Sequence, residues 1–231
     1  MNPKQIAAEL AVSYIHTGMT IGLGTGSTAA FAIHALGRRF QAGNLNLRCI
    51  ATSRESEDLG HTYGLPFVDF TAVHRFDITI DGADEVDTQF RLIKGGGGAL
   101  VREKIVAAAT DTEIIIVDET KVKLALGAFP LPVAVLPYAW EWTQGRLQDK
   151  FGVPAHRRSL PSGLPYLTDD SLYLLDMAFA GPLPNPDLME ADLKTIVGVV
   201  ECGLFVGLCQ RLIIGYADGH VEEKAAPPKM G

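Results

Sequence analysis

Short apolar runs alternate with longer segments of helical spacing along the first half of the chain. The runs that predict buried strands are Thr20–Leu23, Leu47–Ala51, Phe67–Val68, Phe76–Ile80 and Glu113–Val117. The segments that predict helices are residues 5–16, 29–40, 54–63 and 99–110. Strands that alternate with helices in this way predict an α/β domain with a mainly parallel sheet and right-handed crossovers.

In the second half, the pattern changes near Phe129, and Pro130, Pro132 and Pro137 interrupt the chain. The elements predicted there are helices over 138–150 and 187–193 and strands over 172–175, 196–200 and 212–216. We therefore expect a Rossmann-like domain formed by residues 1–129 and 204–231. A smaller α+β domain over residues 130–203 is expected to be inserted near the C-terminal end.

Composition narrows the class of protein. The 231 residues are 47 % hydrophobic, which excludes a disordered chain. The 20 basic and 27 acidic residues give a net charge of −7, and the sequence lacks a basic stripe, so no nucleic-acid partner is expected. No apolar run approaches the ~20 residues of a membrane span, and the start does not resemble a signal peptide. These features predict a cytoplasmic protein.

Cysteines and histidines give no metal or disulfide signal. Cys49, Cys202 and Cys209 are sparse and have no regular spacing, and the 6 histidines are scattered. We therefore expect no metal site and no disulfide framework.

A glycine-rich loop follows the first predicted strand and precedes a predicted helix. Its residues are Gly24, Thr25, Gly26, Ser27 and Thr28. Glycines allow the backbone to approach an anion, and the helix N-terminus supplies free N–H groups with a positive dipole end. A dinucleotide fingerprint needs a glycine where Ser27 stands, and a P-loop needs a lysine after the glycines. The loop therefore favours a phosphate monoester, with a ligand-free tight turn as the alternative.

Acidic residues follow the strand over 76–80, beginning with Asp81-Gly82-Ala83-Asp84. Ligands of open α/β sheets bind outside the carboxyl ends of the strands, so Asp81 and Asp84 are expected beside the first glycine loop. Both are suited to hydrogen-bond sugar hydroxyls. Glu85 and Asp87 are expected to be solvated, and the EF-hand calcium pattern is absent.

A second glycine loop, Gly95-Gly96-Gly97-Gly98, follows Lys94 and precedes a predicted helix that contains Glu103. Four successive glycines cost backbone entropy, which indicates that the backbone must lie against something. Their amides are expected to form an anion-binding nest. Glu103 is either a base or a first-turn residue favoured by the helix dipole. Lysine, amides and one carboxylate together suit proton abstraction next to a carbonyl.

These motifs resemble those of the type A ribose-5-phosphate isomerase family. The matching segments are Gly24-Thr25-Gly26-Ser27-Thr28, Asp81-Gly82-Ala83-Asp84, Lys94-Gly95-Gly96-Gly97-Gly98-Ala99-Leu100, Arg102-Glu103-Lys104, Val117-Asp118-Glu119-Thr120-Lys121, Phe129-Pro130-Leu131-Pro132-Val133 and Val197-Gly198-Val199-Val200-Glu201. They occur in the family's order and extend over nearly the whole chain. The lysine–glycine run combined with Asp-Gly-Ala-Asp is specific.

The resemblance implies interconversion of ribose 5-phosphate and ribulose 5-phosphate through an enediolate, in the non-oxidative pentose phosphate pathway, without metal or organic cofactor. Glu103 is implied as the proton-shuttling base, Asp81 as an aid to ring opening, and Lys94 as a stabiliser of developing charge. The implied substrate-binding residues are Lys4, Thr25, Gly26, Ser27, Thr28, Asp81, Gly82, Ala83, Asp84, Lys94, Gly95, Gly96, Gly97 and Lys121. A homodimer or dimer of dimers is also implied, with the smaller domain in its contacts.

Other functions remain open at this point. A phosphosugar-sensing regulator would need a DNA-binding module, and the α/β pattern already begins at residue 5. A dehydrogenase would need the third glycine and a ribose-binding acid, and both are missing. An acyl-CoA transferase or an aminosugar-phosphate deaminase is compatible with the fold class alone.

Overall fold

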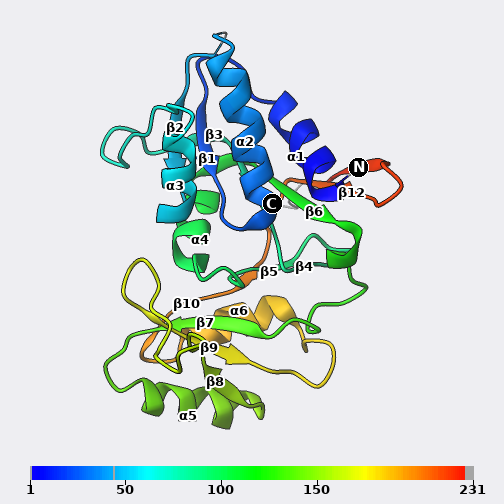
Figure 1. The fold of residues 1–231 in the computed structure, drawn as a ribbon. Coiled ribbons are helices and arrows are strands. Elements are labelled where there is room, and N and C mark those ends of the chain that lie inside the picture. Colours follow the sequence, from blue (N-terminus) through cyan, green and yellow to red (C-terminus); the bar gives the residue numbers. More distant parts are fainter. Residues whose placement is uncertain (1, 44, 227–231) are drawn as a thin grey trace. The chain divides into compact units, whose positions relative to one another are not determined.

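The computed structural model describes residues 2–43 and 45–226 (Figure 1). The chain forms two compact units. The first unit consists of Met1–Ala83, Arg102–Val122 and Gly207–Gly231. The second unit consists of Asp84–Val101 and Lys123–Val206.

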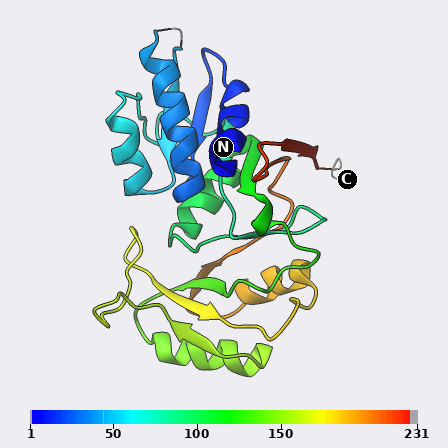
Figure 2. The same cartoon turned by 45° about the vertical axis from the view of Figure 1, so that its right-hand side comes forward.

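Helices and strands alternate along the described residues (Figures 1 and 2). The helices are α1 (Pro3–Ser13), α2 (Ser27–Gln41), α3 (Arg54–His61), α4 (Leu100–Ala108), α5 (Trp140–Phe151), α6 (Pro186–Lys194) and the short 3₁₀ helix η1 (Glu119–Lys121). In the first unit, a six-stranded sheet has the order β13 (Val221–Ala225), β12 (Arg211–Gly215), β6 (Thr110–Asp118), β3 (Phe76–Asp81), β1 (Thr20–Leu23), β2 (Arg48–Ala51).

The six-stranded sheet is parallel except for β13, which pairs antiparallel with β12. Ile21 and Leu23 of β1 belong to the same buried cluster as residues of α1 and α2. Between them, Gly22 faces Val106 of α4, because a Cβ there would lie 2.7 Å from the Val106 Cγ1 atom. Helices therefore cover both faces, which confirms the predicted α/β class with a mainly parallel sheet.

The order of strands places a topological switch point between β1 and β3. From β1 the chain passes through α2 to β2 on one side, and it then crosses to β3 on the other side of β1. Ligands of open α/β sheets bind at such a point, outside the carboxyl ends of the strands. The first glycine loop and Asp81 follow these two strands directly.

In the second unit, strands pair antiparallel in two sheets. The four-stranded sheet has the order β10 (Val199–Cys202), β7 (Leu131–Val135), β9 (Tyr173–Met177), β8 (Ala155–Arg157). The three-stranded sheet has the order β11 (Leu204–Phe205), β5 (Leu92–Ile93), β4 (Glu85–Val86). The α6 helix packs against β10 and the α5 helix against β8, which is an α+β arrangement.

The compact units differ from the expected domain boundaries at 129/130 and 203/204. Residues 84–101, 123–129 and 204–206 group with the second unit. The cause is that β4 and β5 pair with β11 rather than with the six-stranded sheet. The sequence pattern did not reveal β4 and β5, because strands of two residues are too short to show a period. It did not reveal β7 either, because every residue of that strand is buried, and apolar and polar positions do not alternate. The division into domains at 130 and 203 stays a proposal.

Candidate active site

The first glycine loop lies directly against the carboxyl end of β3. The Gly24 N–H donates to the Ile80 carbonyl at 2.9 Å, and the Thr25 N–H donates to Asp81 Oδ1 at 3.0 Å. A Cβ on Gly24 would overlap the Asp81 carboxyl group. A glycine is therefore required at position 24, because only glycine lets the loop backbone approach the buried carboxylate so closely.

Short polar side chains that follow β2 hold this loop from its other side. The Ser56 hydroxyl donates to the Gly24 carbonyl at 2.6 Å. The Thr25 and Thr52 hydroxyls are 2.7 Å apart, and the Thr52 N–H donates to the Leu23 carbonyl at 2.9 Å. The sequence analysis did not identify this turn as a support of the loop. The Thr-Ser pair at the end of a parallel strand was the available signal.

The N-terminus of α2 offers backbone donors at the same edge. Gly26 is the N-cap with φ +96°, and it makes no side-chain cap hydrogen bond. The first N–H groups of a helix have no partner inside the helix. The Lys4 ammonium group donates to the Ser27 hydroxyl at 3.0 Å, so a cation from α1 lies at the first residue of α2. Helix amides beside an ammonium group suit a phosphate.

Two buried carboxylates belong to this edge of the sheet. Asp81 is 1 % exposed, and its Oδ1 atom also accepts the Gly82 N–H at 2.7 Å. Glu103 is 4 % exposed and lies in the first turn of α4. The Phe76 N–H, at the start of β3, bonds the Ala109 carbonyl just after α4. The helix therefore runs back along the sheet, and Glu103 near its N-terminus lies toward the end of β3.

Lys121 lies at the same edge of the sheet, in the short helix η1 that follows β6. This strand runs parallel to β3, with Asp81 opposite Ile115, and η1 follows its last residue. The Asp118 carboxylate caps η1 by accepting the Thr120 N–H at 3.0 Å. The first unit thus brings together, at one edge of one sheet, the predicted residues Lys4, Thr25, Gly26, Ser27, Thr28, Asp81, Gly82, Ala83, Glu103 and Lys121.

The remaining predicted residues form a second group, inside the second unit. Asp84 accepts the Gly96 N–H at 2.7 Å, and its own N–H donates to the Ile93 carbonyl at 2.8 Å. Lys94 is 2 % exposed, and its N–H donates to the Gly203 carbonyl at 2.8 Å. A buried ammonium group is unusual, and this one lies 5.5 Å from the centre of the Phe205 ring.

The second glycine loop uses its amides differently from the expected anion nest. The Gly96 N–H is taken by Asp84, and the Gly98 N–H donates to the Gly95 carbonyl at 3.0 Å. The Gly96 and Gly98 N–H groups, which were expected to belong to an anion-binding nest, therefore have partners within the chain instead. Gly95 and Gly98 have φ values of +101° and +87°, so the run of glycines is needed for the tight turn itself.

The expectation that Glu85 and Asp87 are solvated is wrong. Glu85 is 1 % exposed and accepts the N–H groups of Gly127 and Phe129, each at 2.7 Å. Asp87 is 3 % exposed and pairs with Arg91. Carboxylates can be buried where N–H groups and a guanidinium group compensate the lost water. A run of acidic residues in the sequence does not reveal such partners.

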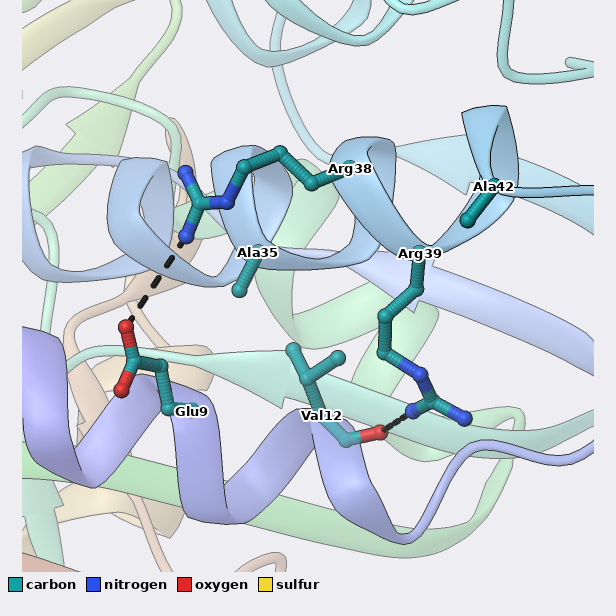
Figure 3. Close-up of a pocket in the computed structure, with 6 residues that line it drawn as sticks. All are labelled: Glu9, Val12, Ala35, Arg38, Arg39 and Ala42. Atoms are coloured by element: carbon teal, nitrogen blue, oxygen red, sulfur yellow. Dashed lines mark hydrogen bonds and ion pairs between the residues drawn. The ribbon is translucent and has the colours of Figure 1, made fainter.

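A cavity of about 360 Å³ lies between α1 and α2, away from the predicted residues (Figure 3). Arg39 donates to the carbonyls of Val12 and Ile15, so it caps the end of α1. Arg38 lies 3.9 Å from Glu9. The two arginines thus support the helix pair.

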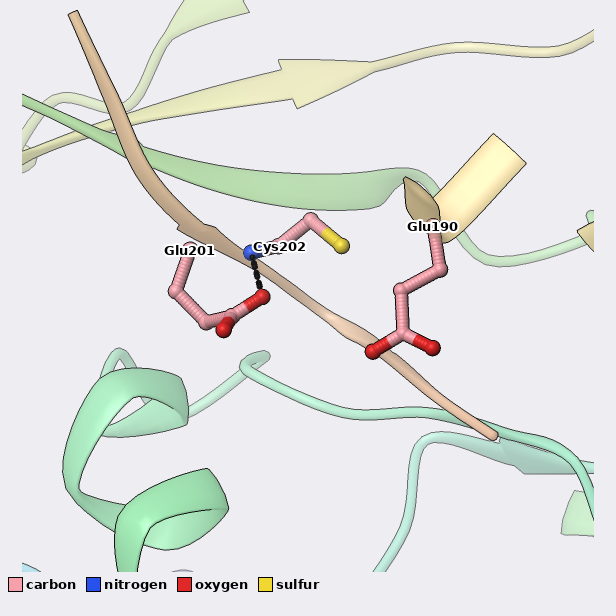
Figure 4. Close-up of side chains that lie close together, drawn as sticks. All are labelled: Glu190, Glu201 and Cys202. Atoms are coloured by element: carbon pink, nitrogen blue, oxygen red, sulfur yellow. Dashed lines mark hydrogen bonds between the residues drawn. The ribbon is translucent and has the colours of Figure 1, made fainter. Parts of the chain in front are cut away.

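One group of side chains in the described residues has metal-ligand spacing: Glu190, Glu201 and Cys202, with ligand atoms within 4.8 Å of one another (Figure 4). The Lys194 ammonium group lies 3.2 Å from Glu190 and 3.4 Å from Glu201. Burial lowers the Lys194 pKa, but the charges of the two glutamates outweigh it and raise this pKa. Lys194 therefore supplies the positive charge that this group needs.

A comparison with protein-family models matches residues 48–219 to ribose 5-phosphate isomerase A (phosphoriboisomerase A). The chain belongs to the ribose 5-phosphate isomerase A family. A member from Bacillus mycoides (strain KBAB4) is 43 % identical over 219 residues, covering 95 % of this chain and 98 % of the relative. One from Prochlorococcus marinus (strain MIT 9312) is 40 % identical over 230 residues, covering 99 % and 97 %.

Comparison with solved structures gives the same family. Ribose 5-phosphate isomerase from Plasmodium falciparum superposes with a TM-score of 0.93 at 35 % identity, covering 96 % of this chain and 97 % of that one. A D-ribose-5-phosphate isomerase in complex with phospho-erythronic acid gives 0.92 at 35 % identity, covering 97 % and 100 %. The chain is therefore an aldose–ketose isomerase of the pentose phosphate pathway, which interconverts ribose 5-phosphate and ribulose 5-phosphate. Within the described residues, no helix combines the length and apolar character that crossing a membrane requires.

Proposed function

We propose that this isomerase works through an enediolate, with Glu103 as the base. Glu103 removes the proton from C2 of the open aldose, and the C1 carbonyl accepts the electron pair. The proton is then returned to C1, while the hydrogen on O2 moves to O1 and C2 becomes the carbonyl. The observation that carries this proposal is the position of Glu103, a buried carboxylate at the sheet edge that holds the first glycine loop.

The phosphate end of the substrate is assigned to the N-terminus of α2. The α2 amides and the ammonium group of Lys4, 3.0 Å from the Ser27 hydroxyl, together form a site for a dianion. The hydroxyls of Thr25 and Thr28 belong to the same assignment, and the ammonium group of Lys121 is proposed as a further contact with the substrate. The relative solved with phospho-erythronic acid supports a site for a phosphorylated sugar acid.

The reacting end of the substrate is assigned to Asp81, Asp84 and Lys94. Lys94 is buried, so its charge acts on the developing enediolate with little screening by water. Asp81 assists ring opening, and Asp84 binds a sugar hydroxyl. The proposed proton transfer needs neither a metal nor an organic cofactor, so dialysis against EDTA should leave the turnover unchanged.

The decisive test is Glu103→Gln. General acid–base groups typically contribute about 10²- to 10⁴-fold, so we expect kcat to fall by about 10³-fold while the circular dichroism stays parental. In D₂O, the parental enzyme should exchange the C2 hydrogen of ribose 5-phosphate and the variant should not. The matched control is Glu57→Gln, which changes a half-buried first-turn glutamate of α3 and should keep parental kcat. Near-parental turnover of Glu103→Gln would disprove the assignment of the base.

A homodimer or dimer of dimers acting in the cytoplasm, without a nucleic-acid partner, belongs to the same proposal. The net charge of −7 argues against nucleic acid. Large apolar side chains of the second unit are exposed in the single chain, namely Leu136, Tyr138, Trp142 and Val197. Exposed apolar groups of this kind favour contact with a second copy. A monomer mass in sedimentation at micromolar concentration would contradict this part.

A further inference from the structure

The carbonyl groups of the second glycine loop are held by one arginine. Arg158, just after β8, donates through Nη1 to the carbonyls of Gly95 and Gly96, at 2.9 and 3.0 Å. The other side of the same guanidinium group binds Asp176 of β9 in a two-pronged contact, Nε to Oδ2 at 2.9 Å and Nη2 to Oδ1 at 2.5 Å. The planar guanidinium group therefore joins a sheet carboxylate to two loop carbonyls.

Tyr166 also binds both Arg158 and the second glycine loop. Its N–H donates to the Arg158 carbonyl at 3.0 Å, and its hydroxyl donates to the Gly97 carbonyl at 3.2 Å. A Cβ on Gly98 would overlap the Tyr166 ring. Three successive loop carbonyls, those of Gly95, Gly96 and Gly97, thus bond to two side chains from a distant part of the sequence.

Fixing these carbonyls also fixes the amides. In a trans peptide unit, the C=O of one residue and the N–H of the next point in opposite directions. With the Gly95 carbonyl on Arg158, the Gly96 N–H is directed away from it, and it meets Asp84 at 2.7 Å. The guanidinium group therefore determines which way the loop presents its donors, and through Gly96 it orients the Asp84 carboxylate.

We infer that Arg158, held in place by Asp176, is a positioning residue for the isomerase reaction. It sets the conformation of the Gly95–Gly97 backbone that orients Asp84 and follows Lys94. This inference rests on the proposed function, because it is through Asp84, Lys94 and the loop that it acts on the sugar. Neither Arg158 nor Asp176 is assigned to touch the substrate.

Arg158→Lys is the main test, because lysine keeps the charge and loses the planar fork. Small displacements of positioning groups cost up to about 10²-fold, and we expect kcat to fall 10- to 100-fold with KM changed less than 3-fold. Asp176→Asn should give a similar loss. The double variant should lose no more than the stronger single variant, because both changes break the same unit. Arg158→Ala should be at least as impaired as Arg158→Lys.

The neighbouring Arg157 provides the matched control. It stacks on the rings of Trp140 and Tyr173, 4.5 and 5.2 Å from their centres. Arg157→Lys should lower the melting temperature and keep parental kcat. The inference is overturned if Arg158→Lys keeps parental kcat, or if its kcat loss merely follows the melting temperature as in Arg157→Lys. The Glu103→Gln result is independent of this set, so failure of the base assignment and failure of the positioning role are distinguishable.

Discussion

The two glycine loops use the same residue type for opposite purposes. In the first loop, the Gly24 carbonyl is held by Ser56, and the loop ends at the N-terminus of α2, whose first amides face outward from the helix. In the second loop, the carbonyls are held by Arg158 and Tyr166, and the Gly96 and Gly98 amides are used inside the unit. The first loop is organised to offer donors, and the second is organised to orient side chains.

This difference shows that a glycine run does not by itself indicate an anion-binding nest. Whether the amides of a glycine loop are available to a ligand depends on which groups bond to the loop backbone. Thr52 and Ser56 follow the strand next to the first loop, whereas Arg158 is separated from Gly96 by 62 positions in the sequence. Because Asp81 is buried and Asp84 is only half-buried, the first loop should tolerate a new side chain less well than the second.

Among changes to the two glycine loops, Gly24→Ala should have the largest effect. The new Cβ overlaps a buried carboxyl group that two N–H groups hold in place, so either Asp81 or the loop must move. We expect kcat/KM to fall by about 10²-fold and the free energy of unfolding to fall by about 2 kcal/mol. Steady-state kinetics and urea unfolding measure both. A variant with parental kinetics would show that close approach of this backbone to Asp81 is not needed.

Gly96→Ala should have a smaller effect. Its Cβ would lie 2.5 Å from Asp84 Oδ1, but Asp84 is only half-buried and can swing aside. We expect a loss of about 10-fold in kcat/KM with nearly parental stability. A hydrogen bond to a charged group is worth about 1.5–3 kcal/mol, and losing about 1.4 kcal/mol of it corresponds to a factor of ten in rate. Gly145→Ala in α5 is the control, because nothing lies within 4 Å of that position. An effect larger than that of Gly24→Ala would reverse the comparison.

The smallest effect concerns thiol chemistry. Burial raises the pKa of Cys49, in β2 opposite Ile21 of β1, to about 12. At pH 8 only roughly one thiol in 10⁴ is then ionised. Cys49 should resist iodoacetamide in the folded protein, and Cys202, buried in the second unit, serves as the internal comparison. In Gly24→Ala, Cys49 labelling should accelerate relative to Cys202. Rapid labelling of Cys49 in the parental protein would contradict the burial argument.

Short-range sequence patterns were enough to predict many of the helices and strands of the first unit. The alternation of β1, α2 and β2 follows from local periodicity. The glycines at the junction of a predicted strand and a predicted helix identified the loop after β1. Local patterns also identified Glu103 as a candidate base. They failed for β4 and β5, which are too short to show a period, and for Glu85, whose partners lie about forty positions away.

By itself, the sequence determined the α/β class, the two glycine loops, the candidate acids and lysines, and the resemblance to one isomerase family. Each of these depends on residues within about one turn or one strand of each other, or on a motif read in order. The tertiary structure alone decided that Glu85 and Asp87 are buried and that β5 pairs with β11. It alone revealed that Arg158 and Asp176 hold the second loop. Contacts between distant segments depend on how the whole chain packs, and no local pattern encodes them.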